Sequence, residues 1–200
     1  MFNFKHLFAN LALAAAALGA CGQAGAAPIY RVDIDTATLG TGPAFLDLYF
    51  LGLDGAAAAT ARVDHLTGAF DGTPDLTGAV TGSVPGPFVF GNAGGGGDLL
   101  QAIQLGGKFS FDVSFMMAPG DTGTTFGWAL FDMTHYLGAD GDLGDLFLQP
   151  DAAPGGQVLV AAPTTQVNRL TAVPEPSTAA LMLVALLALS ARHARGARRA

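Results

Sequence analysis

The chain has a single cysteine among its 200 residues, Cys21, and it lies near the amino terminus. The segment around it reads as an export signal, with Lys5 as a weak basic start, an apolar stretch at 7–19 and the small-residue site Ala24-Gly25-Ala26. Cleavage after Ala26 leaves a mature protein without cysteine. A disulfide, a thiolate metal site and a cysteine nucleophile are then excluded.

A second interpretation of Cys21 stays open. Leu18-Gly19-Ala20-Cys21 resembles the lipobox of bacterial lipoproteins, in which the cysteine becomes the lipid-bearing first residue. Glycine is less usual in the second position of that box, and the Ala-x-Ala site lies only a few residues further on. We therefore expect ordinary cleavage, which gives a signal peptide over residues 1–26, with a lipidated envelope protein as an alternative.

Glutamate is absent from residues 27–173, and basic residues are scarce there. Fifteen aspartates stand against Arg31, Arg62, Lys108 and Arg169, which leaves a net charge of −11. Without a basic footprint, binding to the phosphate backbone of nucleic acid is excluded. Aspartate bonds back to its own backbone in tight turns, whereas glutamate favours helices. Together with 28 glycines, this composition disfavours helices.

What the middle of the chain does contain is short runs of alternating apolar and polar residues, typical of half-buried strands. These runs lie at 30–35, 46–50, 88–90, 109–115, 124–130 and 158–160. Clusters of Gly, Pro and Asp separate them, as at 40–43, 71–74, 85–87 and 119–121. The pattern predicts an all-β domain over 27–172, an antiparallel β-sandwich of jelly-roll or immunoglobulin-like type. Residues 56–61 fit a helical turn and 98–105 either a strand or a short helix, and strand order stays open.

No catalytic motif stands out in this domain. It has no G-x-S-x-G elbow for an activated serine, and His65 and His135 are interpreted as single surface histidines. Trp128 shares its phase with Phe126 and Leu130, so we expect it in the core rather than in a sugar-stacking platform with Tyr49. The prediction is a domain without enzymatic activity and without a cofactor.

The best candidate for a metal site is the loop Asp140-Gly141-Asp142-Leu143-Gly144-Asp145. Carboxylates such as Asp140, Asp142 and Asp145 on a glycine-rich loop can wrap a hard cation such as calcium. The loop lacks the ligand spacing and closing glutamate of an EF-hand, and a solvated acidic turn is the simpler interpretation. Asp33 and Asp35 fall on the polar face of the first strand and are expected to face solvent.

The carboxyl-terminal segment carries the clearest signal. Pro174-Glu175-Pro176 is stiff and extended, because each proline fixes its own φ and restricts the residue before it. Ser177 can cap the apolar segment 178–191, whose 14 residues give only ~21 Å of helix against a hydrocarbon core of ~30 Å. Snorkelling arginines lengthen this marginal span and hold the carboxyl terminus in the cytoplasm, namely Arg192, Arg195, Arg198 and Arg199.

Residues 173–200, with Val-Pro-Glu-Pro-Ser, a Leu/Ala-rich span and an arginine-rich end, resemble the PEP-CTERM sorting signal of Gram-negative bacteria. The resemblance implies recognition by an exosortase, a polytopic membrane enzyme similar to cysteine transpeptidases, which cleaves near the tripeptide. It makes Pro174, Glu175 and Pro176 the recognition element and the four arginines the stop anchor. The polar His193 and the spacing of the arginines depart from the tight basic cluster of that family.

Hosts of this system typically make exopolysaccharide, and the released proteins are associated with the cell surface or the biofilm matrix. The segments YRVDIDTATLGTGPAFLDLYF, GGKFSFDVSFMM and TTFGWALFDM also resemble a recurrent domain found ahead of this signal, for which no activity is implied. We predict an exported structural or adhesive protein, tethered transiently to the inner membrane by its carboxyl-terminal helix and then at the cell surface or extracellular. Its partners would be an exosortase and extracellular polysaccharide. A calcium-dependent carbohydrate-binding module or a secreted hydrolase is the alternative.

Overall fold

The structure is a computed structural model that describes residues 28–150, 156–161 and 165–173. The predicted export signal, the tripeptide 174–176, the apolar segment 178–191 and the four arginines lie outside the described residues and stay predictions. Within the described residues, no helix is long and apolar enough to cross a membrane.

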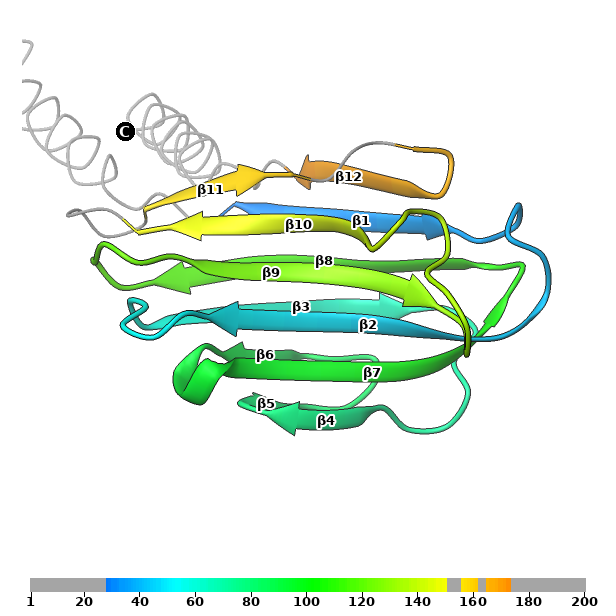
Figure 1. Ribbon diagram of the computed structural model, residues 1–200, viewed down its shortest axis with the longest axis horizontal. Helices are drawn as coiled ribbons and strands as arrows, with labels where there is room; N and C mark the ends of the chain where they lie inside the picture. The colour runs from blue at the N-terminus through cyan, green and yellow to red at the C-terminus, as the bar shows by residue number, and fades with distance from the viewer. Residues whose placement is uncertain (1–27, 151–155, 162–164, 174–200) are drawn as a thin grey trace, which may run out of the picture. The chain divides into compact units, whose positions relative to one another are not determined.

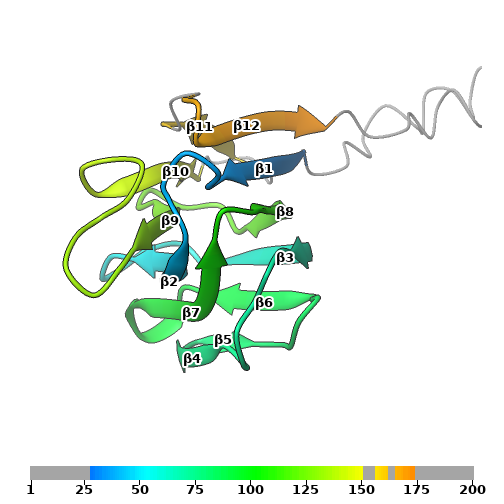
Figure 2. The same cartoon turned by 90° about the vertical axis from the view of Figure 1, so that its right-hand side faces the viewer.

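The described chain is all-β and forms two antiparallel sheets, which confirms the all-β part of the prediction (Figures 1 and 2). In sheet A the order is β12 (Asn168–Val173), β1 (Ile29–Asp35), β8 (Lys108–Met117), β3 (Ala59–Thr67), β6 (Phe88–Gly91) and β5 (Val80–Thr81). In sheet B it is β11 (Gln157–Val160), β10 (Asp142–Gln149), β9 (Thr124–Phe131), β2 (Gly42–Gly52), β7 (Gly96–Leu105) and β4 (Asp75–Gly78).

The two segments that the sequence left open are resolved by pairing. Residues 98–105 belong to β7, which pairs with β2 and β4, so a helix at this position is wrong. Residues 59–61 begin β3, which pairs with β8 and β6, and 56–58 are not helical, so the expected helical turn at 56–61 is wrong. Both segments carry apolar residues that fit either structure locally, and the neighbouring strands decide between them. A short 3₁₀ turn, η2 (Ala93–Gly95), links β6 to β7.

Aromatic side chains from the facing sides of the two sheets form one core. The ring of Phe126 in β9 lies 5.9, 6.2 and 5.8 Å from the rings of Phe90, Phe111 and Phe115 in sheet A. These four side chains are at most 6% exposed. Burying each such ring contributes roughly 1.5–3 kcal/mol, so the contact between the two sheets depends on this cluster.

Trp128 lies fully buried beside this cluster, as its phase in the sequence predicts. Its Nε1 donates a 3.0 Å hydrogen bond to Oδ1 of Asn168, and Nδ2 of Asn168 donates to the carbonyl of Leu143 at 2.9 Å. The buried indole N–H is thus satisfied by the amide oxygen of Asn168, and the amide nitrogen by the carbonyl of Leu143. These bonds join β12 of sheet A to β9 and β10 of sheet B.

The two edges of the pair of sheets differ in how the chain is arranged there. On one side the chain passes directly from β4 in sheet B to β5 in sheet A: the Ala79 N–H donates to the carbonyl of Gly96, and the Ala79 carbonyl accepts from the N–H of Gly91. A Cβ on Gly97 would lie 2.8 Å from the Ala79 backbone, so this crossing requires glycine. On the other side, β11 and β12 are the outer strands of their sheets (Figure 1).

Candidate functional site: a polar groove on sheet A

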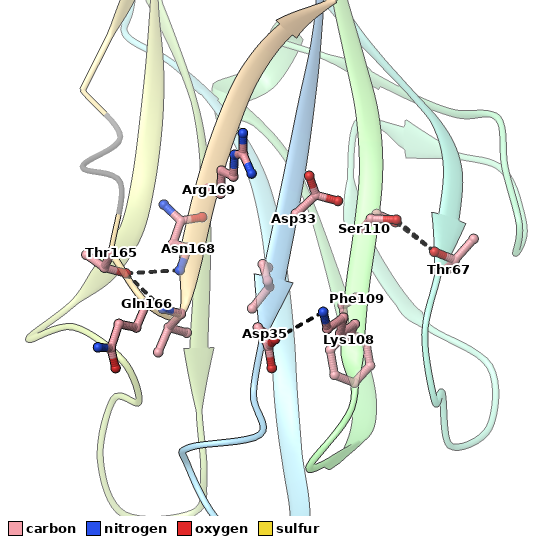
Figure 3. A pocket seen from close by; sticks show the side chains of 12 residues that line it. Asp33, Asp35, Thr67, Lys108, Phe109, Ser110, Thr165, Gln166, Asn168 and Arg169 are labelled. Atoms are coloured by element: carbon pink, nitrogen blue, oxygen red, sulfur yellow. Dashed lines mark hydrogen bonds and ion pairs between the residues drawn. The ribbon is translucent and has the colours of Figure 1, made fainter.

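A groove of about 520 Å³ lies on the outer face of sheet A, where β1 and β3 end and β8 and β12 begin (Figure 3). Its floor is formed by residues of the core, among them Ile34, Phe109 and Val167, which are at most 7% exposed. Its walls carry polar side chains from four strands and from the connection before β12: Asp33, Asp35, Thr67, Lys108, Ser110, Gln166 and Arg169.

Four of these polar side chains form a straight row across the sheet. Asp33 of β1 lies opposite Arg169 of β12 on one side and opposite Ser110 of β8 on the other, and Ser110 lies opposite Thr67 of β3. Figure 3 shows Asp33 between Arg169 and Ser110. With strands spaced ~4.8 Å apart, the row spans about 14 Å. Along the row the functional groups are, in order, a guanidinium, a carboxylate and two hydroxyls.

The next pair along the strands is an ion pair. Nζ of Lys108 lies 3.4 Å from Oδ2 of Asp35, directly across β8 and β1. The Ala37 N–H donates a 3.0 Å hydrogen bond to the other oxygen of Asp35, and this bond is the main cause that lowers the pKa of Asp35. Asp35 therefore already binds Ala37 and Lys108, and Lys108 is paired with Asp35. Their exposed charges largely cancel at this end of the groove.

Arg169 and Asp33 are not committed in this way. Both side chains are exposed, and in the described part of the chain neither takes part in a hydrogen bond or ion pair. Two directly opposite side chains of opposite charge would ordinarily pair. In Figure 3 the guanidinium points along β12, and the carboxylate leans toward Ser110. The β12 end of the row thus offers a guanidinium donor and, next to it, a carboxylate acceptor that are not hydrogen-bonded within the described chain.

Closer to the middle of sheet A, Asp112 accepts hydrogen bonds from two strands. Arg31 binds it through Nε and Nη2, both at 2.7 Å, and Nδ1 of His65 lies 3.0 Å from Oδ2. The bond from Arg31 is the largest cause that lowers the pKa of Asp112. His65 has φ 55° at a register shift in β3, which turns its ring outward. The cluster ties β1, β8 and β3 together.

This cluster contains two of the three members of a Ser-His-Asp arrangement, His65 and Asp112. The prediction of His65 as a single surface histidine missed its contact with Asp112, because the two residues are 47 positions apart. Within the described chain, no hydroxyl is hydrogen-bonded to the ring of His65, so a nucleophile in that position is missing. Among the described residues, the ring of His135 is bonded only to its neighbours Thr134 and Asp132, in the turn after β9.

The outer face of sheet B is acidic. Asp47 and Tyr49 of β2 share this face with Asp98 of β7, and with Asp142 and Asp145 of β10. Burial raises the pKa of Asp47 to about 7, and the neighbouring carboxylate of Asp98 adds to the effect. The buried Oδ1 of Asp47 has no hydrogen-bond partner in the described structure. All four basic residues of the described strands lie on sheet A.

Tyr49 explains the geometry of this acidic face. Its ring lies across Gly127 of β9, where a Cβ would come within 2.2 Å of the ring, and its hydroxyl donates a 2.6 Å hydrogen bond to Asp142. Burial, followed by the bond to Asp142, raises the pKa of Tyr49, so the hydroxyl stays protonated. Tyr49 is thereby held as part of the sheet surface.

The three carboxylates singled out as weak metal candidates have different surroundings. Asp142 binds Tyr49, Asp145 lies further along β10 with its pKa raised by burial and then by the charge of Asp142, and Asp140 lies in the exposed turn before the strand. Among the described residues, no group of three or more His, Cys, Asp or Glu side chains is arranged to hold a metal ion.

The groove was not anticipated from the sequence, although Asp33 and Asp35 were placed on the polar face of their strand. Comparison with protein-family models, curated proteins and solved structures finds no match for this chain.

Proposed function

We propose that this is an exported protein without enzymatic activity, which an exosortase sorts to the cell surface or extracellular matrix. The observation that carries the proposal is the order of features along the chain: export signal, β domain, Pro174-Glu175-Pro176, short apolar segment and arginines. The positions of the strands support it. The first strand begins at Ile29, just after the predicted cleavage site, and the last ends at Val173, directly before the tripeptide.

The domain is, on this proposal, a β-sandwich of jelly-roll type. A jelly roll has eight strands in two sheets, and the strands are connected as two Greek keys. The order β1-β8-β3-β6 opposite β2-β7-β4 supports this type over the immunoglobulin-like one. The strands β9, β10 and β11 then extend sheet B, and β12 extends sheet A.

The role of the domain is structural or adhesive, with extracellular polysaccharide as its partner. Two features support this role: a hydrophobic core that spans both sheets, and outer faces that are polar and acidic. The hydrolase alternative is less supported, because His65 and Asp112 have no hydroxyl partner in the described chain. A lipid on Cys21 would give a different anchor, and labelling with a fatty-acid analogue in wild type and Cys21→Ala separates the two cases.

The sorting proposal is tested by the location of the protein. We expect the wild-type chain to leave the membrane fraction only in cells that contain the exosortase. A triple variant with Pro174→Ala, Glu175→Ala and Pro176→Ala stays in the membrane fraction in the same cells. The matched control Asp121→Ala, in the exposed β8–β9 turn, behaves as wild type. Release of the triple variant at the wild-type level would overturn the proposal.

A further inference from the structure

We propose that the groove on sheet A binds a neutral, hydroxyl-rich saccharide chain, which lies along the row Arg169, Asp33, Ser110 and Thr67. This inference names the ligand class for the surface role proposed above and rests on that role for its biological setting. The binding itself rests on the chemistry and position of the groove.

The walls of the groove select for a polar ligand. The apolar residues Ile34, Phe109 and Val167 are buried in its floor and offer almost no exposed surface. Pockets for drug-like and lipid ligands are lined mainly by apolar side chains with few polar groups. Here the accessible side chains are charged, hydroxyl or amide groups. The ligand must therefore be recognised through hydrogen bonds.

The free groups match the hydroxyl groups of a sugar ring. Each hydroxyl both donates and accepts, so adjacent hydroxyls can accept from a guanidinium and donate to a carboxylate. Arg169 and Asp33 offer these two groups on directly opposite residues, and in the described chain neither takes part in a hydrogen bond or ion pair, although the charge of Asp33 also acts on Arg31. Ser110 and Thr67, joined by a 2.9 Å hydrogen bond, continue the row with further hydroxyls. Bonds to charged groups are stronger than neutral ones.

The distribution of charge selects a neutral chain. The groove holds two acidic and two basic side chains, and Lys108 is already paired with Asp35. A polymer of uronic acids would be repelled by a domain whose net charge is −11. A polymer of amino sugars would be drawn to the acidic outer face of sheet B rather than to the groove. Only a neutral chain gains its affinity from the row itself.

The groove also lies away from the first and last residues of the domain. Ile29 and Val173 are paired at one end of β1 and β12, whereas Asp35, Lys108 and Asn168 mark the other. Asp33 is about 13 Å along the strand from Ile29. The first and last described strands therefore begin and end at the side of sheet A opposite the groove. A shallow polar site binds weakly, and many copies on one surface compensate by avidity.

The test uses the full-length chain purified in detergent and saturation-transfer NMR with three neutral probes. These are the hexasaccharides of glucose in cellulose linkage, of glucose in amylose linkage and of N-acetylglucosamine. We expect at least one of them to receive saturation from the wild-type chain. Arg169→Ala and Asp33→Ala should each weaken its binding about tenfold. Thr171→Ala, on the same face of β12 but outside the groove, is the matched control.

Thermal melting of each variant shows that it is folded. The double variant Ser110→Ala with Thr67→Ala is a second way to weaken sugar binding, and it keeps the charges of Arg169 and Asp33. Absence of saturation transfer to all three neutral probes overturns the inference. So does a signal that the Arg169 and Asp33 variants leave unchanged, or a preference for hexamers of galacturonic acid or glucosamine. Removal of the carboxyl-terminal segment is measured in a separate experiment. If sugar binding fails and sorting is normal, only the inference about the groove is overturned. If sorting fails and sugar binding is observed, only the proposed function is overturned.

Discussion

Ile29, at the start of β1, lies directly opposite Val173, at the end of β12, in the antiparallel register of sheet A. Both ends of the folded domain therefore leave the same end of the same sheet (Figure 1). The predicted cleavage after Ala26 and the tripeptide that starts at Pro174 are each within a few residues of this pair. Export and sorting would thus act on neighbouring points of the domain.

The pairing predicts that cysteines at positions 29 and 173 form a disulfide. Opposite residues of an antiparallel pair have Cα atoms ~4.5–5.5 Å apart, which lies within the range of a disulfide. In Ile29→Cys with Val173→Cys we expect a bond that stabilises the domain by about 2–4 kcal/mol. Mass spectrometry after thiol alkylation detects it. The misaligned pair Arg31→Cys with Val173→Cys should stay reduced, and equal oxidation of both pairs would contradict the register.

Asp47 predicts a pH dependence of stability. Its pKa in the folded protein is raised to about 7, mainly by burial and then by the charge of Asp98, whereas an unfolded aspartate has a pKa of ~3.9. Between these values the folded state keeps a proton that the unfolded state has lost. The free energy of unfolding contributed by this group therefore falls as the pH rises from about 4 to 7, and it stays low above that.

Asp47→Asn should remove this dependence. Because the group is partly exposed, solvent screening reduces the effect, and we expect the variant to be more stable than wild type by about 1–2 kcal/mol at pH 8 and similar to it at pH 4. Urea unfolding at both pH values measures the difference. Asp54→Asn, in the exposed β2–β3 loop, changes the same charge without burial and serves as the control. A gain that is the same at both pH values would argue against a buried proton.

Phe126 should be the most sensitive position of the core, because its ring contacts aromatic rings of both sheets. Phe126→Ala is expected to lower the free energy of unfolding by about 3–5 kcal/mol. Phe126→Leu retains more volume and keeps the domain measurable if the alanine variant does not fold. Met133→Ala removes a side chain that is 85% exposed and should change stability by less than about 0.5 kcal/mol. Similar losses in Phe126→Leu and Met133→Ala would refute the role of this cluster.

Calcium should leave the domain unchanged. A cation that binds only the folded state raises the melting temperature by mass action. Asp142 is bound by Tyr49, and among the described residues no three carboxylates are arranged to hold an ion, so we expect no shift at about 1 mM calcium, roughly the affinity of extracellular calcium modules. Differential scanning fluorimetry with calcium and with magnesium makes the comparison. A rise with calcium that is lost in Asp142→Asn would favour the calcium-dependent alternative.

Local patterns were sufficient to predict the class of the fold. The alternation at 109–115 and 124–130 corresponds to β8 and β9, and the phase of Trp128 correctly predicted its burial. The order of the strands could not be predicted, because it depends on which distant strands pair. Residues 98–105 show the limit: their composition fits a helix, and pairing with β2 and β4 makes them a strand.

The groove could not be predicted from local patterns either, because it also depends on which distant strands pair. Thr67, Ser110, Asp33 and Arg169 belong to four strands that are far apart in the sequence and form one row only through the register of sheet A. Each residue taken alone is an ordinary polar position on a strand. The contact between His65 and Asp112 was missed similarly. Pairing of β1 with both β8 and β12 would have been needed to foresee the row.

The intact mass of the protein released from cells that contain the exosortase tests the central claim most directly. The account predicts a polypeptide that begins near Ala27 and ends near the tripeptide 174–176, without the apolar segment and the four arginines. In cells without the exosortase, the chain should keep its full carboxyl terminus. A released protein whose mass still includes Arg192 to Arg199 would contradict the account.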